Sequence, residues 1–214
     1  MKMNFKILKA AVVDAQEKCE NLDEKRIVPK MMLRRRLTRS ARIMVYLADA
    51  CDFSEGSVVY GSAYGEMQAT ADIVGAIASK NPISPTAFQN SVYNTAPSYF
   101  SLLHKNKSEI ITISSGDETS RNVLQSAALQ AIVNEAPVLA VCSEAINIAN
   151  IEEVNSCTDF LESGIAMTLE MTTKAATLEV LKREHKGLAP SLWAMMDVVV
   201  ACDAYDDAII SIEL

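Results

Sequence analysis

Ser114-Ser115-Gly116-Asp117-Glu118 follows a short apolar run, Glu109–Ile113, and precedes a segment with helical periodicity, Thr119–Val133. The pattern predicts a buried strand, a turn of small residues and a helix. Many α/β enzymes place a nucleophile on such a turn, because free N–H groups and the helix dipole stabilise developing negative charge there. Here a carboxylate stands where a thiol or hydroxyl would be expected to act. The stretch therefore indicates the framework of an active site without its reactive residue.

The same turn also has a purely structural interpretation. Ser115 and Glu118 match the S-x-x-E capping box, in which both side chains accept hydrogen bonds from free N–H groups at the helix start. A nucleophile at Ser114 or Ser115 is a sharper possibility, but the G-x-S-x-G elbow is absent. Nothing in the sequence connects the chain's two histidines, His104 and His185, to this turn. A Ser–His pair is therefore not expected.

The composition excludes several classes of protein. Half of the 214 residues are hydrophobic and 22% are charged, which is typical of a folded chain with a substantial core. The net charge of −7 disfavours attraction of the whole surface to nucleic acid or to an anionic membrane. No apolar run reaches the roughly 18 residues that a membrane helix needs. We therefore expect no nucleic-acid partner and no membrane span.

The N-terminal segment and the cysteines indicate the compartment. Lysines interrupt the apolar part of residues 1–9, so a secretory signal is not expected. The five cysteines are scattered and form no C-x-x-C pair, which indicates neither a zinc site nor a disulfide framework. We expect a cytoplasmic protein with reduced thiols, with no metal site and no cofactor.

Hydrophobic periodicity predicts that strands alternate with helices along the chain. The expected strands are Asn4–Val13, Ser57–Tyr60, Glu109–Ile113, Val138–Cys142, Gly164–Met171 and Ala208–Ile212. The expected helices are Met31–Ala50, Glu66–Ser79, Ser84–His104 with an interruption at Pro97, Thr119–Asn134, Ala175–Glu184 and Ser191–Asp203. This alternation favours a layered α/β fold. No repeat or linker is visible, so residues 1–214 are expected to form a single domain.

Gly61 and Gly65 lie between an expected strand and an expected helix, where a phosphate could bind. Their loop lacks the Lys-Ser/Thr pair of a P-loop and the third glycine of a dinucleotide fingerprint. A tight strand-to-helix turn is therefore the favoured interpretation.

Five arginines within nine positions stand out in this acidic protein: Arg34, Arg35, Arg36, Arg39 and Arg42. On one continuous helix, Arg35, Arg39 and Arg42 would share a face, and the other two would flank it. A solvated or ion-paired helix face is one interpretation. A docking patch for an acidic partner is the other, because guanidinium groups pair with carboxylates and phosphates through two hydrogen bonds.

Ser84 and Pro85 predict the start of a helix, as its N-cap and its first residue. The helix mixes large apolar side chains, such as Phe88 and Tyr93, with amides and hydroxyls. A half-buried helix of the chain's own core is one interpretation. A contact surface fits the mixture better, because interfaces combine aromatic side chains with polar groups.

Taken in order, several motifs resemble the N-terminal half of β-ketoacyl synthases, which belong to the thiolase-fold family. The motifs are Leu33–Arg39, Tyr60–Glu66, Ile83–Phe88 with Ser91–Asn94, and Ile113–Glu118. The resemblance covers roughly residues 31–171 and includes Gly164–Glu170 as the family's closing strand. In particular, the chain is similar to the short ketosynthase-like subunits of aryl polyene biosynthesis that act as chain-length factors. The resemblance implies one layered half of the thiolase-like fold, with helices flanking a mixed sheet.

The resemblance also has a consequence for catalysis. Ketosynthases use a cysteine nucleophile on the turn after the strand, together with two histidines from their C-terminal half. Superposing the family pattern places Asp117, or Gly116 after a shift of one residue, at the cysteine position. None of the five cysteines lies there, and the half that carries the histidines has no counterpart. The resemblance therefore implies a subunit that does not condense acyl groups by itself.

A partner is implied in the same way. In ketosynthases and chain-length factors, the helix that matches Ser84–Leu103 packs at the subunit interface and reaches the partner's acyl tunnel. The residues implied to contact a full-length β-ketoacyl synthase in a heterodimer are Phe88, Ser91, Val92, Tyr93 and Thr95. A bulky side chain at a tunnel end limits the length of the product, because packed interiors tolerate little overfilling. Charge complementarity makes Arg34–Arg42 a candidate docking patch for an acidic acyl carrier protein.

We therefore expect a non-catalytic chain-length factor that shapes the acyl tunnel of its partner in polyene or fatty-acid-like biosynthesis. Two other classes remain open. One is a stand-alone serine acyltransferase or hydrolase that uses Ser114 or Ser115, and the other is a self-associating scaffold. The tail Ala189–Leu214 departs from the family pattern. We expect the tail to cover a face of the sheet through an apolar stripe at helical spacing, formed by Leu192, Trp193, Met196, Val199 and Val200.

Overall fold

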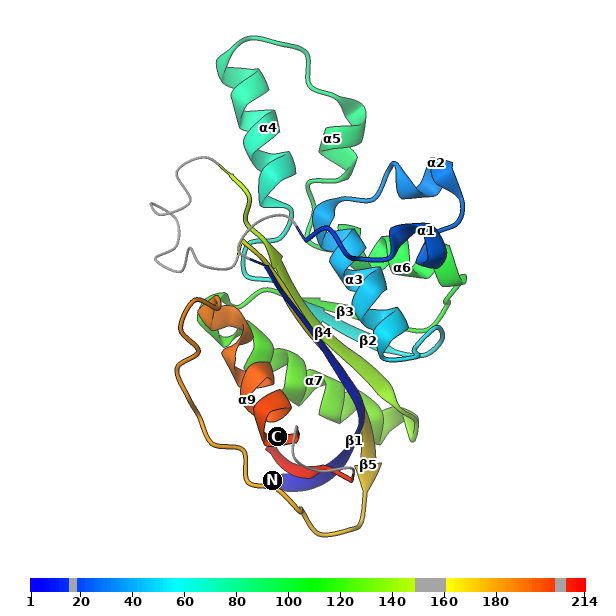
Figure 1. The fold of residues 1–214 in the computed structure, drawn as a ribbon, viewed down its shortest axis with the longest axis vertical. Coiled ribbons are helices and arrows are strands. Elements are labelled where there is room, and N and C mark those ends of the chain that lie inside the picture. The colour runs from blue at the N-terminus through cyan, green and yellow to red at the C-terminus, as the bar shows by residue number, and fades with distance from the viewer. Residues whose placement is uncertain (16–18, 149–160, 203–206) are drawn as a thin grey trace.

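A six-stranded mixed sheet lies at the centre of the protein. The computed structural model describes residues 1–15, 19–148, 161–202 and 207–214 (Figure 1). The strands are β1 (Lys2–Ala15), β2 (Val58–Gly61), β3 (Ile110–Ile113), β4 (Val138–Ala145), β5 (Glu162–Thr172) and β6 (Ile209–Glu213). Their order across the sheet is β3-β2-β4-β5-β1-β6, with β3, β2 and β4 parallel and the remaining neighbours antiparallel. The expected α/β fold with a mixed sheet is confirmed.

Helices cover both faces of the sheet and also project from one end of it (Figure 1). They are α1 (Glu24–Ile27), α2 (Met31–Arg34), α3 (Arg39–Ala50), α4 (Met67–Ala78), α5 (Pro85–Gln89), α6 (Thr95–His104), α7 (Thr119–Asn134) and α9 (Trp193–Cys202), with 3-10 turns η1 (Gly116–Glu118) and η2 (Pro190–Leu192). One core joins α3 and α6 to the sheet, and a second core joins α7 and α9 to the opposite face. No helix of the described residues is long and apolar enough to cross a membrane.

The central strand β4 shows why the two cores are separate. Every residue of β4 is buried, and its side chains alternate between the two faces. Leu139 and Val141 belong to the core under α3, whereas Ala140 and Cys142 belong to the core under α7. An apolar run without polar alternation is typical of a strand that is covered on both faces.

The expected continuous helix Met31–Ala50 is wrong, because Thr38 divides it into α2 and α3. Thr38 has an extended backbone, and its hydroxyl accepts a hydrogen bond from the Ala41 N–H at 3.1 Å. This is an N-cap, which ends one helical segment and starts the next. Consequently, Arg35 does not share a helical face with Arg39 and Arg42.

The expected helix Ser84–His104 is also divided, but not at Pro97. Ser84 does cap α5 as expected, by accepting a bond from the Ala87 N–H at 3.4 Å. The helix then stops, and α6 begins after the turn of residues 90–94. Pro97 lies in the first turn of α6, where a missing N–H costs no helical hydrogen bond.

No helix forms in the expected segment Ala175–Glu184. The N–H groups of Thr177 and Leu178 instead donate to the carbonyl oxygen of Ile209 in β6, at 2.9 and 3.1 Å. The Thr177 hydroxyl accepts from the Ile209 N–H at 3.0 Å in return. The segment therefore lies along the end of an edge strand, which satisfies backbone groups that a helix would have used internally.

The tail covers a sheet face, as expected. Leu192, Met195 and Val198 are buried in the core beneath α7. Trp193, Met196 and Val199 are partly buried against the same core, whereas Val200 is exposed. The expected stripe is therefore shifted around the helix, and the expected end at Asp203 lies outside the described residues.

Two glycines allow helices to approach the sheet closely. A Cβ atom on Gly61 would lie 2.5 Å from the Val123 side chain of α7, and one on Gly164 would lie 2.8 Å from Ile43 and Leu47 of α3. Side chains at these positions would push the helices away from the strands. Gly61 is thus explained by packing.

We predict that Gly61→Ala lowers the free energy of unfolding by about 1–3 kcal/mol, because the added methyl group overfills the contact with α7. Chemical denaturation of the purified chain measures this change. Gly75→Ala is the matched control. Nothing lies within 4 Å of a Cβ atom at Gly75 in helix α4, so the change should stabilise the chain by about 0.5–1 kcal/mol. A neutral Gly61→Ala would contradict the packing argument.

Candidate functional site

The turn 114–118 is exposed on the surface at one edge of the sheet. Its strand β3 is half-buried and not fully buried as expected, because β3 is an edge strand with β2 on one side only. The predicted capping box is wrong. Ser115 makes no side-chain cap, and its N–H donates to the Thr119 hydroxyl at 3.0 Å, while Glu118 pairs with Arg121 at 2.5 Å.

Neither histidine lies in a hydrogen bond with a serine of this turn. His185 bonds to Asp197 at 2.8 Å, and His104 packs on the ring of Phe100 with a centroid distance of 4.8 Å. The side chains of Ser114 and Ser115 are exposed. The described geometry contains no Ser–His pair, and Gly116 and Asp117 occupy the exposed turn that the family resemblance assigns to the nucleophile.

The four described cysteines also lie away from this turn. Cys19, Cys51 and Cys142 are free thiols, Cys202 ends helix α9, and Cys157 lies outside the described residues. Burial raises the pKa of Cys51 to about 12 and also raises the pKa of Cys142. These two thiols therefore stay protonated at neutral pH and behave as small hydrophobic groups.

The glycine loop after β2 wraps around a buried carboxylate. The Glu144 Oε1 atom accepts from the Ala63 N–H at 2.7 Å and from the Ser191 hydroxyl at 2.8 Å. The Oε2 atom accepts from the Ser62 hydroxyl at 2.7 Å and from the Tyr64 N–H at 3.3 Å. Burial raises the pKa of Glu144, and these four donors oppose that shift. The loop therefore binds a carboxylate of its own chain, which supports the tight-turn interpretation.

The arm formed by α4 and α5 exposes large apolar side chains. None of the twelve residues of α4 is buried, although Asp72 is its single charged residue. Val74 and Ile77 are each 60% exposed, and Ile83 in the connection to α5 is 41% exposed. The arm projects away from the sheet (Figure 1). An exposed apolar surface of this kind marks an interaction site.

The five residues proposed for the partner interface are distributed over the arm and the turn that follows it. Phe88, Val92 and Tyr93 are exposed, Ser91 is half-buried, and Thr95 is buried at the start of α6. The Tyr93 ring lies over Gly65, whose Cβ position is 2.9 Å away, and its hydroxyl donates to the Ala63 carbonyl at 3.2 Å. A hollow of about 470 Å³ between α2, α5 and α6 is lined by Val92 and Thr95.

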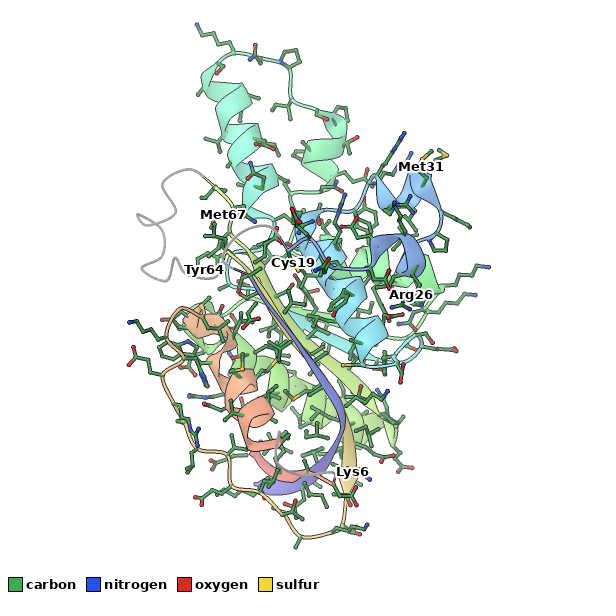
Figure 2. The ribbon with its side chains drawn as sticks, viewed as in Figure 1. Lys6, Cys19, Arg26, Met31, Tyr64 and Met67 are labelled. Atoms are coloured by element: carbon green, nitrogen blue, oxygen red, sulfur yellow. The ribbon has the colours of Figure 1, made fainter. Side chains whose placement is uncertain are left out.

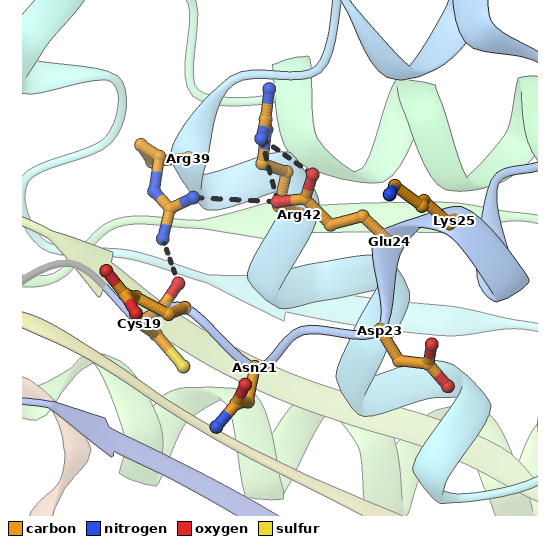
Figure 3. A pocket seen from close by; sticks show the side chains of 8 residues that line it. Cys19, Asn21, Asp23, Glu24, Lys25, Arg39 and Arg42 are labelled. Atoms are coloured by element: carbon orange, nitrogen blue, oxygen red, sulfur yellow. Dashed lines mark hydrogen bonds and ion pairs between the residues drawn. The ribbon is translucent and has the colours of Figure 1, made fainter.

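Two of the five arginines are used inside the fold. Arg39 donates from Nε to the Glu162 Oε1 atom at 2.6 Å. Its Nη2 atom donates to the Cys19 carbonyl at 2.9 Å (Figure 3). Arg42 donates to both carboxylate oxygens of Glu24 at 2.7 and 2.8 Å. These side chains therefore tie α1 and the start of β5 to α3, and they do not form a free patch.

The other three arginines surround the short helix α2. Arg34 donates to the Val28 carbonyl at 2.7 Å. Arg35 and Arg36 are exposed, and their side chains make no ion pair within the described residues. Met31 and Met32 in α2 are 52% and 74% exposed. Figure 2 shows Met31 at this tip of the molecule. A small surface of cations and flexible apolar side chains is thus available.

A cleft of about 370 Å³ lies between α3 and the base of the arm. Met67, Ala69, Ala87 and Ala145 form an apolar part of its wall. Glu66 also lines the cleft, although only 8% of this residue is exposed. The Thr38 hydroxyl donates to the Glu66 Oε1 atom at 2.7 Å, and burial raises the pKa of Glu66 to about 7.

The comparisons with known proteins identify the family. The family model described as "Beta-ketoacyl synthase, N-terminal domain" matches residues 10–201. The chain belongs to this family. The resemblance seen in the sequence motifs is confirmed, and the match extends into the tail. No individual sequence among curated proteins is significantly similar to the chain.

Solved structures share the ketosynthase fold at low sequence identity. One is a chain of the ketosynthase ApeO in complex with its chain length factor ApeC from Xenorhabdus doucetiae, with a TM-score of 0.67, 19% identity, and coverage of 90% of this chain and 92% of that chain. Another is a type II polyketide ketosynthase, AntDE, with the carrier protein AntF, with a TM-score of 0.64, 16% identity, and coverage of 79% and 62%. A third is the ishigamide ketosynthase/chain length factor, with a TM-score of 0.56, 11% identity, and coverage of 83% of this chain and 63% of that chain.

We predict that Glu66→Gln stabilises the chain at pH 8 and has a smaller effect at pH 5. Folding raises the pKa of the Glu66 carboxyl from 4.5 to about 7, so the folded state loses stability as the pH rises through that window. The loss is on the order of 2–3 kcal/mol at pH 8, and a neutral amide avoids it. Urea unfolding of both proteins from pH 5 to pH 8 measures the difference.

Glu144→Gln is the matched control and should have the opposite sign. Each Glu144 oxygen accepts two hydrogen bonds, so either orientation of an amide would turn its NH₂ group toward two donors. We expect a loss of about 1–3 kcal/mol. Equal effects of the two substitutions at pH 8 would show that the number of donors does not decide the outcome.

Proposed function

We propose that this chain is a non-catalytic ketosynthase-like subunit, a chain-length factor, that pairs with a full-length β-ketoacyl synthase. The heterodimer would elongate a polyene acyl chain on an acyl carrier protein in the cytoplasm. Residues 1–214 would act as one domain, since β1 and β6 from opposite ends of the sequence are neighbours in one sheet. Asp117 or Gly116 at the nucleophile position supports the absence of condensation activity.

The unburied arm is the observation on which this proposal depends. Burial of a large apolar side chain contributes about 1.5–3 kcal/mol, and the arm leaves several such side chains in water. Phe88 on α5 and Val92 and Tyr93 in the turn after it are further exposed side chains with large apolar groups. A protein partner that covers these groups would recover that free energy. An enzyme acting alone on a small substrate has no need of such a surface.

The edge strand β3 offers a second contact for a protein partner. Its sequence Ile110-Ile111-Thr112-Ile113 contains no charge and no proline. Native proteins commonly protect an edge strand with charged residues or prolines, because its free N–H and C=O groups can otherwise pair with strands of other chains. An unprotected, half-buried edge therefore supports association at this side of the sheet.

The solved structures support the type of partner. One of the matched structures is described as a ketosynthase with its chain length factor, and the shared region spans 92% of the matched chain. Its length is therefore similar to that of the present chain. The AntDE structure includes an acyl carrier protein, which supports a carrier as the second partner. For that carrier we propose Arg35 and Arg36 as the main contacts, since Arg39 and Arg42 are paired inside the fold.

The first test is co-expression with the ketosynthase encoded beside this chain, followed by mass determination by size exclusion and light scattering. We expect a one-to-one complex that elongates acyl chains only when both subunits are present. Exclusive homodimers would favour a scaffold. Modification of Ser114 or Ser115 by a serine-reactive phosphonate would favour a hydrolase.

We predict that the double change Val74→Asp and Ile77→Asp weakens this complex by at least ~100-fold, because two carboxylates would be desolvated at the interface. Both positions are 60% exposed, so the unfolding transition of the isolated chain should not change. Val133→Asp, at a 74% exposed position of α7, is the control and should leave the complex intact. Unchanged affinity of the double variant would exclude the arm from the interface.

Phe88→Ala should lengthen the products of the complex, and Phe88→Trp should shorten them. Phe88 is 68% exposed in the described structure, so its size affects a partner's tunnel more than the chain's own core. Mass spectrometry of the released acyl chains measures the distribution. An unchanged distribution in an intact complex would remove Phe88 from the tunnel.

A further inference from the structure

The cleft at the base of the arm combines an apolar wall with one buried carboxyl. Its volume of about 370 Å³ is within the range of ligand pockets. Glu66 stands just before α4, and Thr38 stands just before α3, so both are held at the starts of helices. This position fixes the Glu66 carboxyl relative to the wall of the cleft, as a binding group requires.

Glu66 differs from the two other strongly buried glutamates of the described chain. Glu144 accepts four hydrogen bonds, and Glu162 accepts bonds from the Arg39 guanidinium and from the Cys19 N–H at 2.7 Å. Glu66 accepts one hydrogen bond, from Thr38, and pairs with no cation among the described residues.

A buried carboxyl with so few partners is costly to keep in a fold. The Arg39 side chain, which also lines the cleft, is already held by Glu162 and the Cys19 carbonyl. Glu66 therefore has hydrogen-bonding capacity that its own chain does not use. Polar side chains such as Gln68 and Asn90 also line the cleft, but its apolar part suits the methylene groups of a mostly hydrocarbon ligand.

We propose that this cleft binds the far end of the growing acyl chain when that end carries a hydroxyl or carbonyl group, with the Glu66 carboxyl as its hydrogen-bond partner. The inference rests on the proposed function, because it takes the acyl chain from there. The apolar wall binds methylene groups without selecting among them. Glu66 supplies the selection, since a methyl end leaves the buried carboxyl unpaired whereas a polar end satisfies it.

The test compares two starter chains of equal length on the carrier protein, octanoyl and 8-hydroxyoctanoyl, in the complex of this chain with its ketosynthase. The ratio of the two kcat/KM values is measured at each elongation step. At the chain length that reaches the cleft, we expect the wild-type complex to prefer the hydroxyl-ended chain by about 10-fold. Glu66→Leu should remove the preference, and Glu66→Gln, which still donates and accepts, should keep it.

Glu55→Leu is the matched control, because Glu55 is an exposed residue that precedes the opposite end of β2. It should keep the preference. A complex that elongates both chains without preference at any length would overturn the inference and leave the proposed function intact. A Glu66→Leu complex that retains the preference, or that fails to assemble although Glu66→Gln assembles normally, would also overturn it. Absence of elongation by the wild-type complex would count against the proposed function itself.

Discussion

The four hydrogen bonds to the buried Glu144 carboxylate hold together the end of the sheet from which the arm projects. Their donors come from the loop after β2 and from Ser191 at the start of the tail. Glu144 itself stands near the end of the fully buried strand β4. A buried carboxyl group is tolerated only when such donors surround it. This constraint fixes where the glycine loop ends and where the tail begins.

Several features follow from that fixed loop. Gly61 lets α7 approach the sheet, and Gly65, with φ of +58°, accepts the Tyr93 ring against its backbone. The loop then leads directly into α4, so the arm leaves the sheet at a defined position. The cleft with Glu66 lies at the base of this arm. A rigidly held surface suits partner binding, because less conformational entropy is lost when the partner associates.

The charged side chains of this acidic protein fall into two groups, those paired within the fold and those with few contacts. Glu144, Glu162 and the paired Arg39 are satisfied within the fold and stabilise it. Glu66 and the exposed Arg35 and Arg36 make few contacts within the described chain and remain available. Sequence spacing alone could not distinguish these groups. The difference depends on whether donors from distant segments reach each side chain.

The sequence determined the alternation of strands and helices, the layered α/β fold and the family, because hydrophobic periodicity and short motifs are local properties. It also placed the start of α5 at Ser84. The capping box, the continuous helix before Ala50 and the helix after Ala175 were wrong. In each case an oxygen atom of Thr119, Thr38 or Ile209 accepts a hydrogen bond that the expected structure did not include. Only the tertiary structure decided that α4 stays unburied and that Arg39 is occupied, because burial and pairing depend on contacts between segments far apart in the chain.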